Sequence, residues 1–320
     1  MRVAQFFRYG GPEVVRVVEV DTPEPAADEV LVRVAATSVN PMDAETRAGR
    51  MRLLSGRRSP HGLGIDVAGT VERLGTAVAT DGRFAVGDAV WGVVARFFSG
   101  TTGAAAEFMT VPARLLAIIP SSLDFIGAAA LPAVGITAIT AVRYRGRTEA
   151  GDRVLVRGAA GGVGSSAVQF AHSLGAHVTA LASAGDLAWV RGLGADVALD
   201  RRATGPDDLG CFDVLVDTVG TELWRYRRLL APGGRMVTIA FGSPADVLSI
   251  AASTIYGASR IRTFLGQPPL GMIDQLGSAV RSGAIGPQVG AVFDLDDIAD
   301  AHRSLAMKSV RGKRVIRIGA

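Results

Sequence analysis

The segment of this chain most clearly suited to chemistry is a turn built almost entirely from glycine and alanine. Residues 154–176 read VLVRGAAGGVGSSAVQFAHSLGA. VLV predicts a short buried strand, residues 158–164 a turn with few side chains, and the apolar spacing over 165–174 a helix. A strand, a glycine turn and a helix in this order present backbone N–H groups at a helix N-terminus, where they can hold a pyrophosphate.

The fingerprint inside this turn consists of Ala159, Gly161 and Gly164, so its first position is alanine and not glycine. A glycine pattern alone is more often an ordinary turn, but here the surrounding strand–helix–strand unit is complete. We therefore predict a dinucleotide site in which the pyrophosphate meets the backbone of Ala160, Gly161, Gly162, Val163 and Gly164.

The middle of the chain continues the same alternation of short apolar strands and helices. Strands are predicted over 177–183, 196–200, 212–220 and 235–240, and helices over 186–194 and 221–230. Apolar strands of this length that alternate with helices are typical of a parallel sheet covered on both faces.

The end of the second predicted strand bears on which dinucleotide binds. An NAD site usually has Asp or Glu there, hydrogen-bonded to the ribose 2′-OH. This chain has Ala182, Ser183, Ala184 and Gly185. Asp186 follows, and we expect it to be the N-cap of the next helix. Because no acidic group stands where it would repel a 2′-phosphate, the pattern favours NADPH, with Ser183 at the cofactor.

The flanking regions have a different pattern. Residues 1–120 contain five short strand-like segments broken by Gly and Pro, which is typical of β-rich structure. A helix-rich bridge follows at 123–142, and the tail is mixed, with helices at 272–283 and 296–308 and strands at 291–295 and 313–319. The predicted fold class is therefore α/β, with an α/β domain (122–256) inserted into a β-rich domain (1–121 and 257–320). The cleft between them is the expected ligand site.

Composition excludes several classes of protein. The 320 residues are 48% hydrophobic and 20% charged, which suits a soluble protein of about two domains. A net charge of +4 without long charge runs gives little support to nucleic-acid binding, and RYRGR (143–147) is expected to be a solvated helix end. No uncharged apolar run reaches 18 residues, and the N-terminal segment lacks the apolar core of a signal peptide, so we expect no membrane span and a cytoplasmic location. The single Cys211 excludes an internal disulfide; it lies just before a predicted buried strand and is expected to be an inert small apolar residue.

Ordered motifs along the whole chain resemble the medium-chain dehydrogenase/reductase superfamily, and within it the zinc-free quinone oxidoreductase (zeta-crystallin-like) branch. The matching segments are GPEVVRVVEVDTPEP (11–25), SVNPMDAETRAG (38–49), LGIDVAGTVERLG (63–75), GDAVWG (87–92), LPAVGITAIT (131–140), GAAGGVGSSAVQFA (158–171), DTVG (217–220) and DIADAHRSLAMKSVRGKRVIRI (297–318). This resemblance implies a GroES-like catalytic domain together with a Rossmann domain.

Zinc is the first question that the resemblance raises. Zinc-using relatives carry Cys in the segment matching SVNPMD and His-Glu in the one matching LGID, where this chain has Asn40 and Ile65-Asp66. Zinc needs converging Cys, His and carboxylate ligands, and the four histidines lie on different predicted elements. We therefore predict no metal site, and hydride transfer from NADPH to an already electrophilic carbon, that of a quinone or an α,β-unsaturated carbonyl.

The resemblance also implies where the cofactor is held. It places Thr137 near the nicotinamide, and the backbone of the RTFLGQP segment (262–268) at the carboxamide. Arg201 or Arg202, with Lys308 or Arg311, would meet the 2′-phosphate. The cofactor residues expected on this basis are Thr137, Arg201, Val219, Ala240, Phe241, Gly242, Phe264, Leu265 and Lys308. Core packing is the alternative for the side chains of Phe241 and Phe264.

For the substrate, Asn40 is the best polar candidate, because its amide can donate to a carbonyl oxygen, and we expect it to be catalytic. Asp43 and Arg47 follow at helical spacing and are expected to form an ion pair. Glu45 stands where many relatives carry Tyr, which removes a tyrosine proton donor from the pocket. Trp91, Phe97 and Phe98 form either an apolar wall of the pocket or part of the core.

Two alternatives stay open, namely an enoyl-thioester reductase and a nicotinamide-cofactor-binding protein with little catalysis. A homodimer is expected as well. The RTFLGQP segment is β-rich, ends in Pro and lies, by analogy with relatives, at the edge of the Rossmann sheet. An uncovered sheet edge tends to find a partner, and symmetric dimers are the commonest oligomers.

Overall fold

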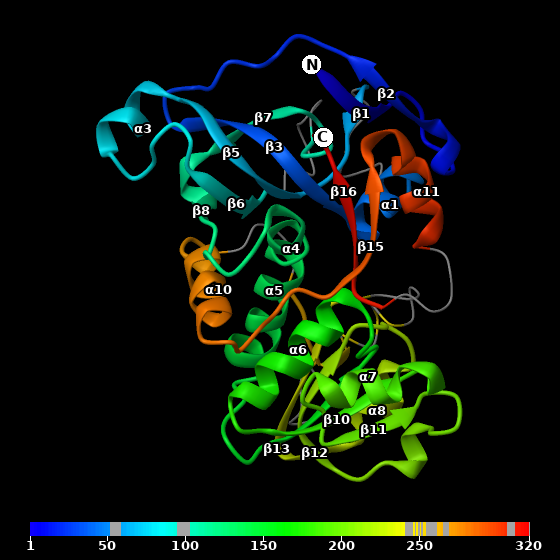
Figure 1. Ribbon diagram of the computed structural model, residues 1–320. Coiled ribbons are helices and arrows are strands. Elements are labelled where there is room, and N and C mark those ends of the chain that lie inside the picture. Colours follow the sequence, from blue (N-terminus) through cyan, green and yellow to red (C-terminus); the bar gives the residue numbers. More distant parts are fainter. Residues whose placement is uncertain are drawn as a thin grey trace. The chain divides into compact units, whose positions relative to one another are not determined.

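The computed structural model describes residues 1–51, 59–94, 103–240, 246, 248, 250, 252–253, 261–264, 269–305 and 311–319 (Figure 1). The chain divides into two compact units. Unit 1 comprises residues 1–133, 267–281 and 287–320, and unit 2 comprises 134–266 and 282–286. Unit 1 extends past residue 121 because helix α4 (Phe125–Ala129) packs against strands β3 (Glu29–Val39) and β5 (Asp66–Leu74).

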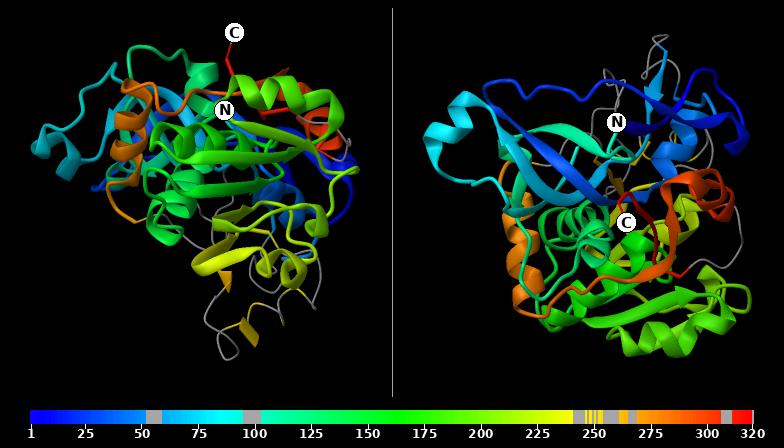
Figure 2. Two further views of the ribbon diagram at one scale, coloured as in Figure 1. Left: turned by 90° about the horizontal axis from the view of Figure 1, so that it is seen from below. Right: turned by 45° about the horizontal axis from the view of Figure 1, so that its top comes forward.

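Unit 1 contains two sheets, whose strands run from blue through cyan to teal and from orange to red in Figure 2. The larger sheet runs in the order β15-β16-β3-β5-β6-β8, with β7 also paired to β3, and the smaller in the order β2-β1-β4. Only the β15–β16 pair is parallel among these described strands. The remaining bounds are β1 (Arg2–Phe6), β2 (Val15–Glu19), β4 (His61–Gly62), β6 (Ala89–Val93), β7 (Phe108–Pro112), β8 (Leu116–Ile118), β15 (Val289–Asp294) and β16 (Lys313–Arg317).

The α-helices described in unit 1 are α1 (Pro41–Arg47), α3 (Thr76–Asp81), α4, α10 (Met272–Arg281) and α11 (Ile298–Ser304). Apolar residues at alternate positions of β3, β5 and β7 form one core with Ala4 and Phe6 of β1 and the apolar side of α11. The five strand-like segments predicted within residues 1–120 are found as β2, β3, β5 and β6, with the fifth divided into β7 and β8. Strand β1 and helix α3 were not anticipated. In β1 the polar Gln5 is buried among apolar neighbours, so the segment does not alternate.

Unit 2 is built on a six-stranded sheet whose order is β11-β10-β9-β12-β13-β14 (Figure 1, green to yellow). Every strand pair in it is parallel. The strands are β9 (Arg153–Arg157), β10 (His177–Ala182), β11 (Val197–Asp200), β12 (Phe212–Asp217), β13 (Leu230–Thr238) and β14 (Ile261–Arg262). This is the predicted Rossmann-type sheet, and the α/β fold class is confirmed.

The helices of unit 2 connect these strands. They are α5 (Pro132–Ile139), which continues as a π-helix over Thr140–Arg145, α6 (Gly162–Ser173), α7 (Leu187–Gly192) and α8 (Leu223–Arg227). Helix α6 begins at Gly162, earlier than the apolar spacing suggested, so the glycine turn is shorter and the helix N-terminus lies inside it. The RYRGR segment is a solvated helix end, as predicted.

Cys211 immediately precedes β12, whose start at Phe212 agrees with the sequence prediction, and its side chain is exposed. Among the described residues, no helix combines the length and the apolar character that crossing a membrane requires.

Candidate functional site

The glycines of the turn between β9 and α6 are required for different reasons. Gly158 adopts φ +73°, and a Cβ there would lie 2.3 Å from the hydroxyl oxygen of Thr218. A Cβ on Gly164 would lie 2.1 Å from the carbonyl oxygen of Gly158, so this position packs the helix against the turn. Within the described part of the chain, a Cβ on Gly161 would meet only that same oxygen, at 3.4 Å. Gly161 is therefore the position where the folded chain itself has room, which suits close approach by a ligand.

The N-terminus of α6 is suited to an anion. Gly161 is the N-cap in extended conformation, and it has no side chain to cap the first helical N–H groups. The helix is twelve residues long, so its dipole adds to the attraction for a pyrophosphate. Residues 160–163 are half-buried, whereas Gly164 is buried.

The end of β10 is where the sequence pattern predicts the ribose of the cofactor. The backbone N–H of Arg201 donates to the carbonyl of Ala182 at 2.8 Å, which places the start of the 201–202 arginine pair beside the end of β10. Arg201 is exposed. Asp186 is at the N-cap position of α7, but its buried carboxylate accepts a hydrogen bond from the hydroxyl of Ser183 and makes no cap bond, which corrects that part of the expectation.

The other residues expected at the cofactor differ in burial, and several lie outside the described part of the chain. Thr137 in α5 is half-buried, Val219 follows β12 and is 41% exposed, and Ala240 and Phe264 are half-buried. Phe98, Phe241, Gly242, Leu265 and Lys308 lie outside the described residues, as does Phe97. The roles assigned to all of these positions stay predictions.

In unit 1, the segment around Asn40 forms a buried polar cluster with the start of β5 and the C-terminal strand. We call Ser38, Asn40, Asp66 and Lys313 the Asp66 cluster. The fully buried carboxylate of Asp66 accepts from the hydroxyl of Ser38, from Asn40 Nδ2 at 2.9 Å and from the backbone N–H of Ala133 at 2.6 Å. Lys313 Nζ lies 3.3 Å from Asp66 Oδ2.

This cluster determines the orientation of the Asn40 amide. Lys313 Nζ donates to Asn40 Oδ1 at 2.6 Å, while Asn40 Nδ2 donates to Asp66 and, at 3.4 Å, to the carbonyl of Ser38. An ammonium can only donate and a carboxylate can only accept, so the opposite amide orientation is disfavoured. The side chain of Asn40 is thus engaged inside the protein, and a bond to a substrate oxygen would have to replace one of these contacts.

Asp43 and Arg47 do not form the expected ion pair. The carboxylate of Asp43 accepts from the backbone N–H groups of Asn40 (2.8 Å) and Gly64 (3.2 Å), and so caps helix α1. Arg47 instead donates to the carbonyl of Gly10 at 2.7 Å. The expected Asp43–Arg47 ion pair is therefore wrong, because the carboxylate of Asp43 binds backbone N–H groups and caps the helix. Burial raises the pKa of Asp43 to about 6, although both N–H groups and Lys313 oppose the shift.

Of the two described residues expected at the substrate, Glu45 is in an ion pair and Trp91 is buried in the protein. Glu45 forms an ion pair with Arg50, and hydrogen bonds from that guanidinium lower the pKa of Glu45. Trp91 in β6 is fully buried, which favours the core interpretation. Their placement in a substrate pocket stays a prediction.

The donor set of the Asp66 cluster does not fit zinc. An amide, a carboxylate and a hydroxyl are present, and the ammonium of Lys313 already neutralises the carboxylate. Zinc sites use converging Cys, His and carboxylate ligands. No three His, Cys, Asp or Glu side chains within the described ranges are grouped as metal ligands.

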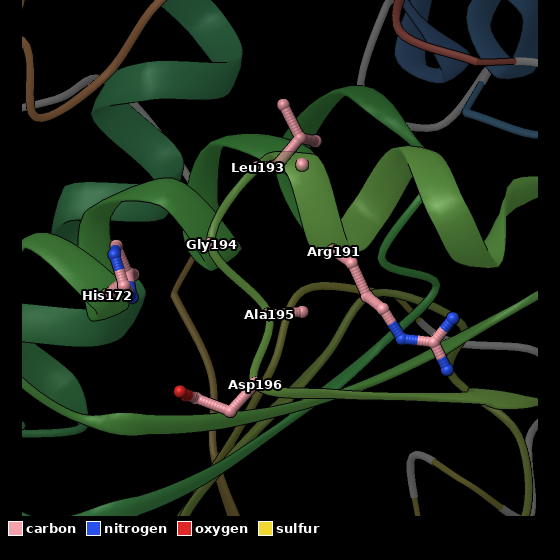
Figure 3. A pocket seen from close by; sticks show the side chains of 7 residues that line it. His172, Arg191, Leu193, Gly194, Ala195 and Asp196 are labelled. Atoms are coloured by element: carbon pink, nitrogen blue, oxygen red, sulfur yellow. The ribbon is translucent and has the colours of Figure 1, made fainter.

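A separate polar depression of about 400 Å³ lies on unit 2 (Figure 3). It is lined by His172 near the end of α6 and by residues 191–196, which lead from α7 into β11. These segments lie at the amino ends of the parallel strands. Open α/β sheets bind ligands at the carboxyl ends, so we do not assign this depression to the cofactor.

Comparisons with known proteins agree with this architecture. Residues 26–121 match the family model described as the alcohol dehydrogenase GroES-like domain, and residues 193–316 match the one described as zinc-binding dehydrogenase. The chain is 32% identical to the NADPH-dependent alkenal/one oxidoreductase of Arabidopsis thaliana, covering 99% of this chain and 79% of that protein. It is 30% identical to a quinone oxidoreductase of Pseudomonas aeruginosa, covering 98% of both.

Solved structures show the same fold. The crystal structure of Escherichia coli quinone oxidoreductase complexed with NADPH aligns with a TM-score of 0.85 at 26% identity, covering 99% of this chain and all of that one. The chain belongs to the medium-chain dehydrogenase/reductase superfamily, in its quinone oxidoreductase branch.

Proposed function

We propose that this protein is an NADPH-dependent, zinc-independent reductase that transfers hydride to a quinone or to the β-carbon of an α,β-unsaturated carbonyl. The observation that carries the proposal is the turn between β9 and α6, where an uncapped helix N-terminus and the open Cβ position of Gly161 provide room for a pyrophosphate. Relatives named for quinone and alkenal reduction support the substrate class.

The residues that would hold the cofactor follow from the geometry of unit 2. The first N–H groups of α6 would bind the pyrophosphate, and the exposed Arg201 beside the end of β10 would bind the 2′-phosphate. The hydroxyl of Ser183 donates to the buried carboxylate of Asp186. When bound, NADPH supplies the hydride for reduction.

On the substrate side, Asn40 would donate to the oxygen on which negative charge develops. Its amide orientation is set by Lys313 and Asp66, so the donor nitrogen keeps a defined position. That nitrogen donates to Asp66 and, at 3.4 Å, to the carbonyl of Ser38, and the longer bond to Ser38 is the one that a substrate oxygen would replace. The Asp66 cluster does not fit zinc, so we derive no step through a metal.

The proposal is tested by measuring NADPH and NADH consumption with a panel of quinones, enones and simple alcohols. We expect turnover with quinones or enones and NADPH, unaffected by prolonged EDTA treatment. Chelator-sensitive activity, or alcohol oxidation that outpaces quinone and enone reduction, would contradict it.

The same assay separates the two alternatives. Faster reduction of 2-enoyl thioesters than of free enones would favour an enoyl-thioester reductase, and Glu45, paired with Arg50 where many relatives carry Tyr, counts against it. Tight NADPH binding without turnover of any acceptor would favour a cofactor-binding protein.

A further inference from the structure

The last residues of three neighbouring strands of unit 2 meet in one buried ionic cluster. Arg157 ends β9, Asp217 ends β12 and Thr238 ends β13. The strand register pairs Asp217 with Arg157 on one side and with Thr238 on the other. We call these three residues the Asp217 cluster.

The carboxylate of Asp217 has no exposed surface and is surrounded by donors. Arg157 Nη1 donates to Oδ1 at 2.6 Å, while Thr238 Oγ1 at 2.8 Å and the backbone N–H of Gly220 at 2.9 Å donate to Oδ2. Burial raises the pKa of Asp217, and these donors oppose the shift. A buried carboxylate with this many partners holds its neighbours in one arrangement, because any loosened contact leaves a desolvated charge unsatisfied.

Arg157 extends the same cluster into the chain that follows β12. Its Nη1 also donates to the carbonyl of Thr221 at 2.8 Å, and its guanidinium lies 3.5 Å from the ring centre of Tyr226 in α8. The guanidinium therefore fixes both ends of the turn over residues 218–221. Its side chain is only 6% exposed, so water screens these contacts little.

The turn after β12 is also fastened to the glycine turn after β9. The N–H and the hydroxyl of Thr218 both donate to the carbonyl of Arg157, at 3.3 and 2.8 Å. Gly158 follows directly, and the Thr218 hydroxyl occupies the space that a Cβ on Gly158 would need. Beyond β13, the N–H of Ile239 donates to the carbonyl of Asp217 at 3.1 Å.

These contacts converge at the carboxyl ends of the strands, where ligands bind in open α/β sheets. The loops that leave the three strands begin at Gly158, Thr218 and Ile239, and they carry the expected cofactor residues. We propose that Asp217, with Arg157 and Thr238, is a positioning residue that holds these three loops ready for NADPH without touching it. The ligand in this statement rests on the proposed function. Such preorganisation reduces the ordering cost of binding.

The chain offers a matched control on the same two strands. Arg153 at the start of β9 donates to Asp213 in β12 at 3.1 Å, so an Arg–Asp pair also links the amino ends of these strands. Asp213→Asn removes this ion pair at the ends of the strands opposite the loops. For Thr238→Val, the control is Thr179→Val, since Thr179 is also a buried threonine in a strand of this sheet. Thr238→Ser keeps the hydroxyl and should restore function.

The experiment measures NADPH dissociation constants by fluorescence titration, unfolding by urea, and amide hydrogen exchange of the full chain. Losing a hydrogen bond to a charged group predicts that Asp217→Asn weakens NADPH binding by about tenfold or more and Thr238→Val by roughly three- to tenfold. Asp213→Asn, Thr179→Val and Thr238→Ser should each stay within about twofold of the natural chain. In the cofactor-free protein, exchange should quicken across residues 158–164 and 218–221 in Asp217→Asn and Thr238→Val only.

Different outcomes of these measurements bear on the positioning role of Asp217 and on the proposed cofactor. Unchanged exchange in both loops, or NADPH affinity in Asp217→Asn no lower than in Asp213→Asn, would overturn the positioning role. If Asp217→Asn does not fold, Thr238→Val set against Thr238→Ser decides the question alone. A natural chain that binds no NADPH would overturn the proposed cofactor and the positioning role for it, even if exchange showed the loops to be linked.

Discussion

At the residue scale, Gly161 and Gly164 lie in the same turn but are glycine for different reasons, the first to leave room for the cofactor and the second to let the helix pack against the turn. Gly161→Val should abolish NADPH binding and leave the chain folded, because its Cβ meets only one protein atom, at 3.4 Å. Gly164→Ala should instead destabilise the fold by about 1–3 kcal/mol, because its Cβ would lie 2.1 Å from the carbonyl oxygen of Gly158. Cofactor titration and urea unfolding of both variants check this. Normal NADPH binding by Gly161→Val would mean that the pyrophosphate binds elsewhere.

Arg201 carries the prediction on cofactor choice. Arg201→Glu should weaken NADPH binding by about 1.5–3 kcal/mol, since a charge-assisted bond to the 2′-phosphate would be lost, and NADH binding should change little. Arg228→Glu, at the exposed C-terminal end of α8, is the control for a general charge effect. Equal affinity of the natural chain for both cofactors would contradict the assignment.

The glycine turn could be located from the sequence because it depends on local spacing. Asn40 was reached through the family resemblance, and its role stays a prediction. The partners of Asn40 and Asp217 could not be found in the same way, since Lys313 lies 273 residues from Asn40 and Arg157 lies 60 from Asp217. Both contacts depend on strand order and register, which fix the neighbours of a buried carboxylate only after the sheet has formed.

At the element scale, the Lys313–Asp66 pair ties the C-terminal strand β16 to β5. Lys313→Met should lower the free energy of unfolding by roughly 3–5 kcal/mol, because it leaves Asp66 buried without its counter-ion. The double variant Lys313→Met/Asp66→Asn should lose less than the sum of the two single variants. Urea unfolding of the natural chain, the two single variants and the double variant gives a double-mutant cycle. Strict additivity of the changes in unfolding free energy would show that Lys313 and Asp66 do not interact.

Helices α1 and α11 contain buried groups with opposite pH dependence. Burial, with Arg47 nearby, lowers the pKa of His302 from 6.5 to about 4, so the unfolded chain takes the proton first. This contribution to stability is present above pH 6.5 and is lost as the pH falls through 4, by up to about 3 kcal/mol. The raised pKa of Asp43, about 6, acts in the other direction, because its stabilisation is lost as the pH rises from 3.8 through 6.

His302→Gln should therefore flatten the loss of stability between pH 6.5 and 4.5, whereas Asp43→Asn should make that loss steeper. Urea unfolding of both variants and the natural chain at several pH values gives the slopes. Parallel pH profiles for His302→Gln and the natural chain would mean that His302 titrates normally in the folded state.

At the scale of the whole molecule, hydrophobic periodicity anticipated the two larger sheets because most of their strands alternate or are continuously apolar. It missed pairings that depend on short or polar segments, such as β1 with its buried Gln5 and the two-residue β4. The expected domain limit at residue 121 differs from the unit limit at 133, since the contacts of α4 with β3 and β5 lie far apart in the sequence.

The β14 end of the unit 2 sheet carries the prediction of a homodimer. Strand β14 ends the described strand order, with β13 as its one neighbour in that sheet, and an uncovered edge favours pairing with a second copy. A two-fold axis would pair the two edges symmetrically. Light scattering at micromolar concentration should give twice the 33.1 kDa mass of one chain. Because dimerisation stabilises the folded state by mass action, the midpoint of thermal unfolding should also rise with protein concentration. The mass of a single chain, together with a concentration-independent midpoint, would show that this edge stays unpaired in solution.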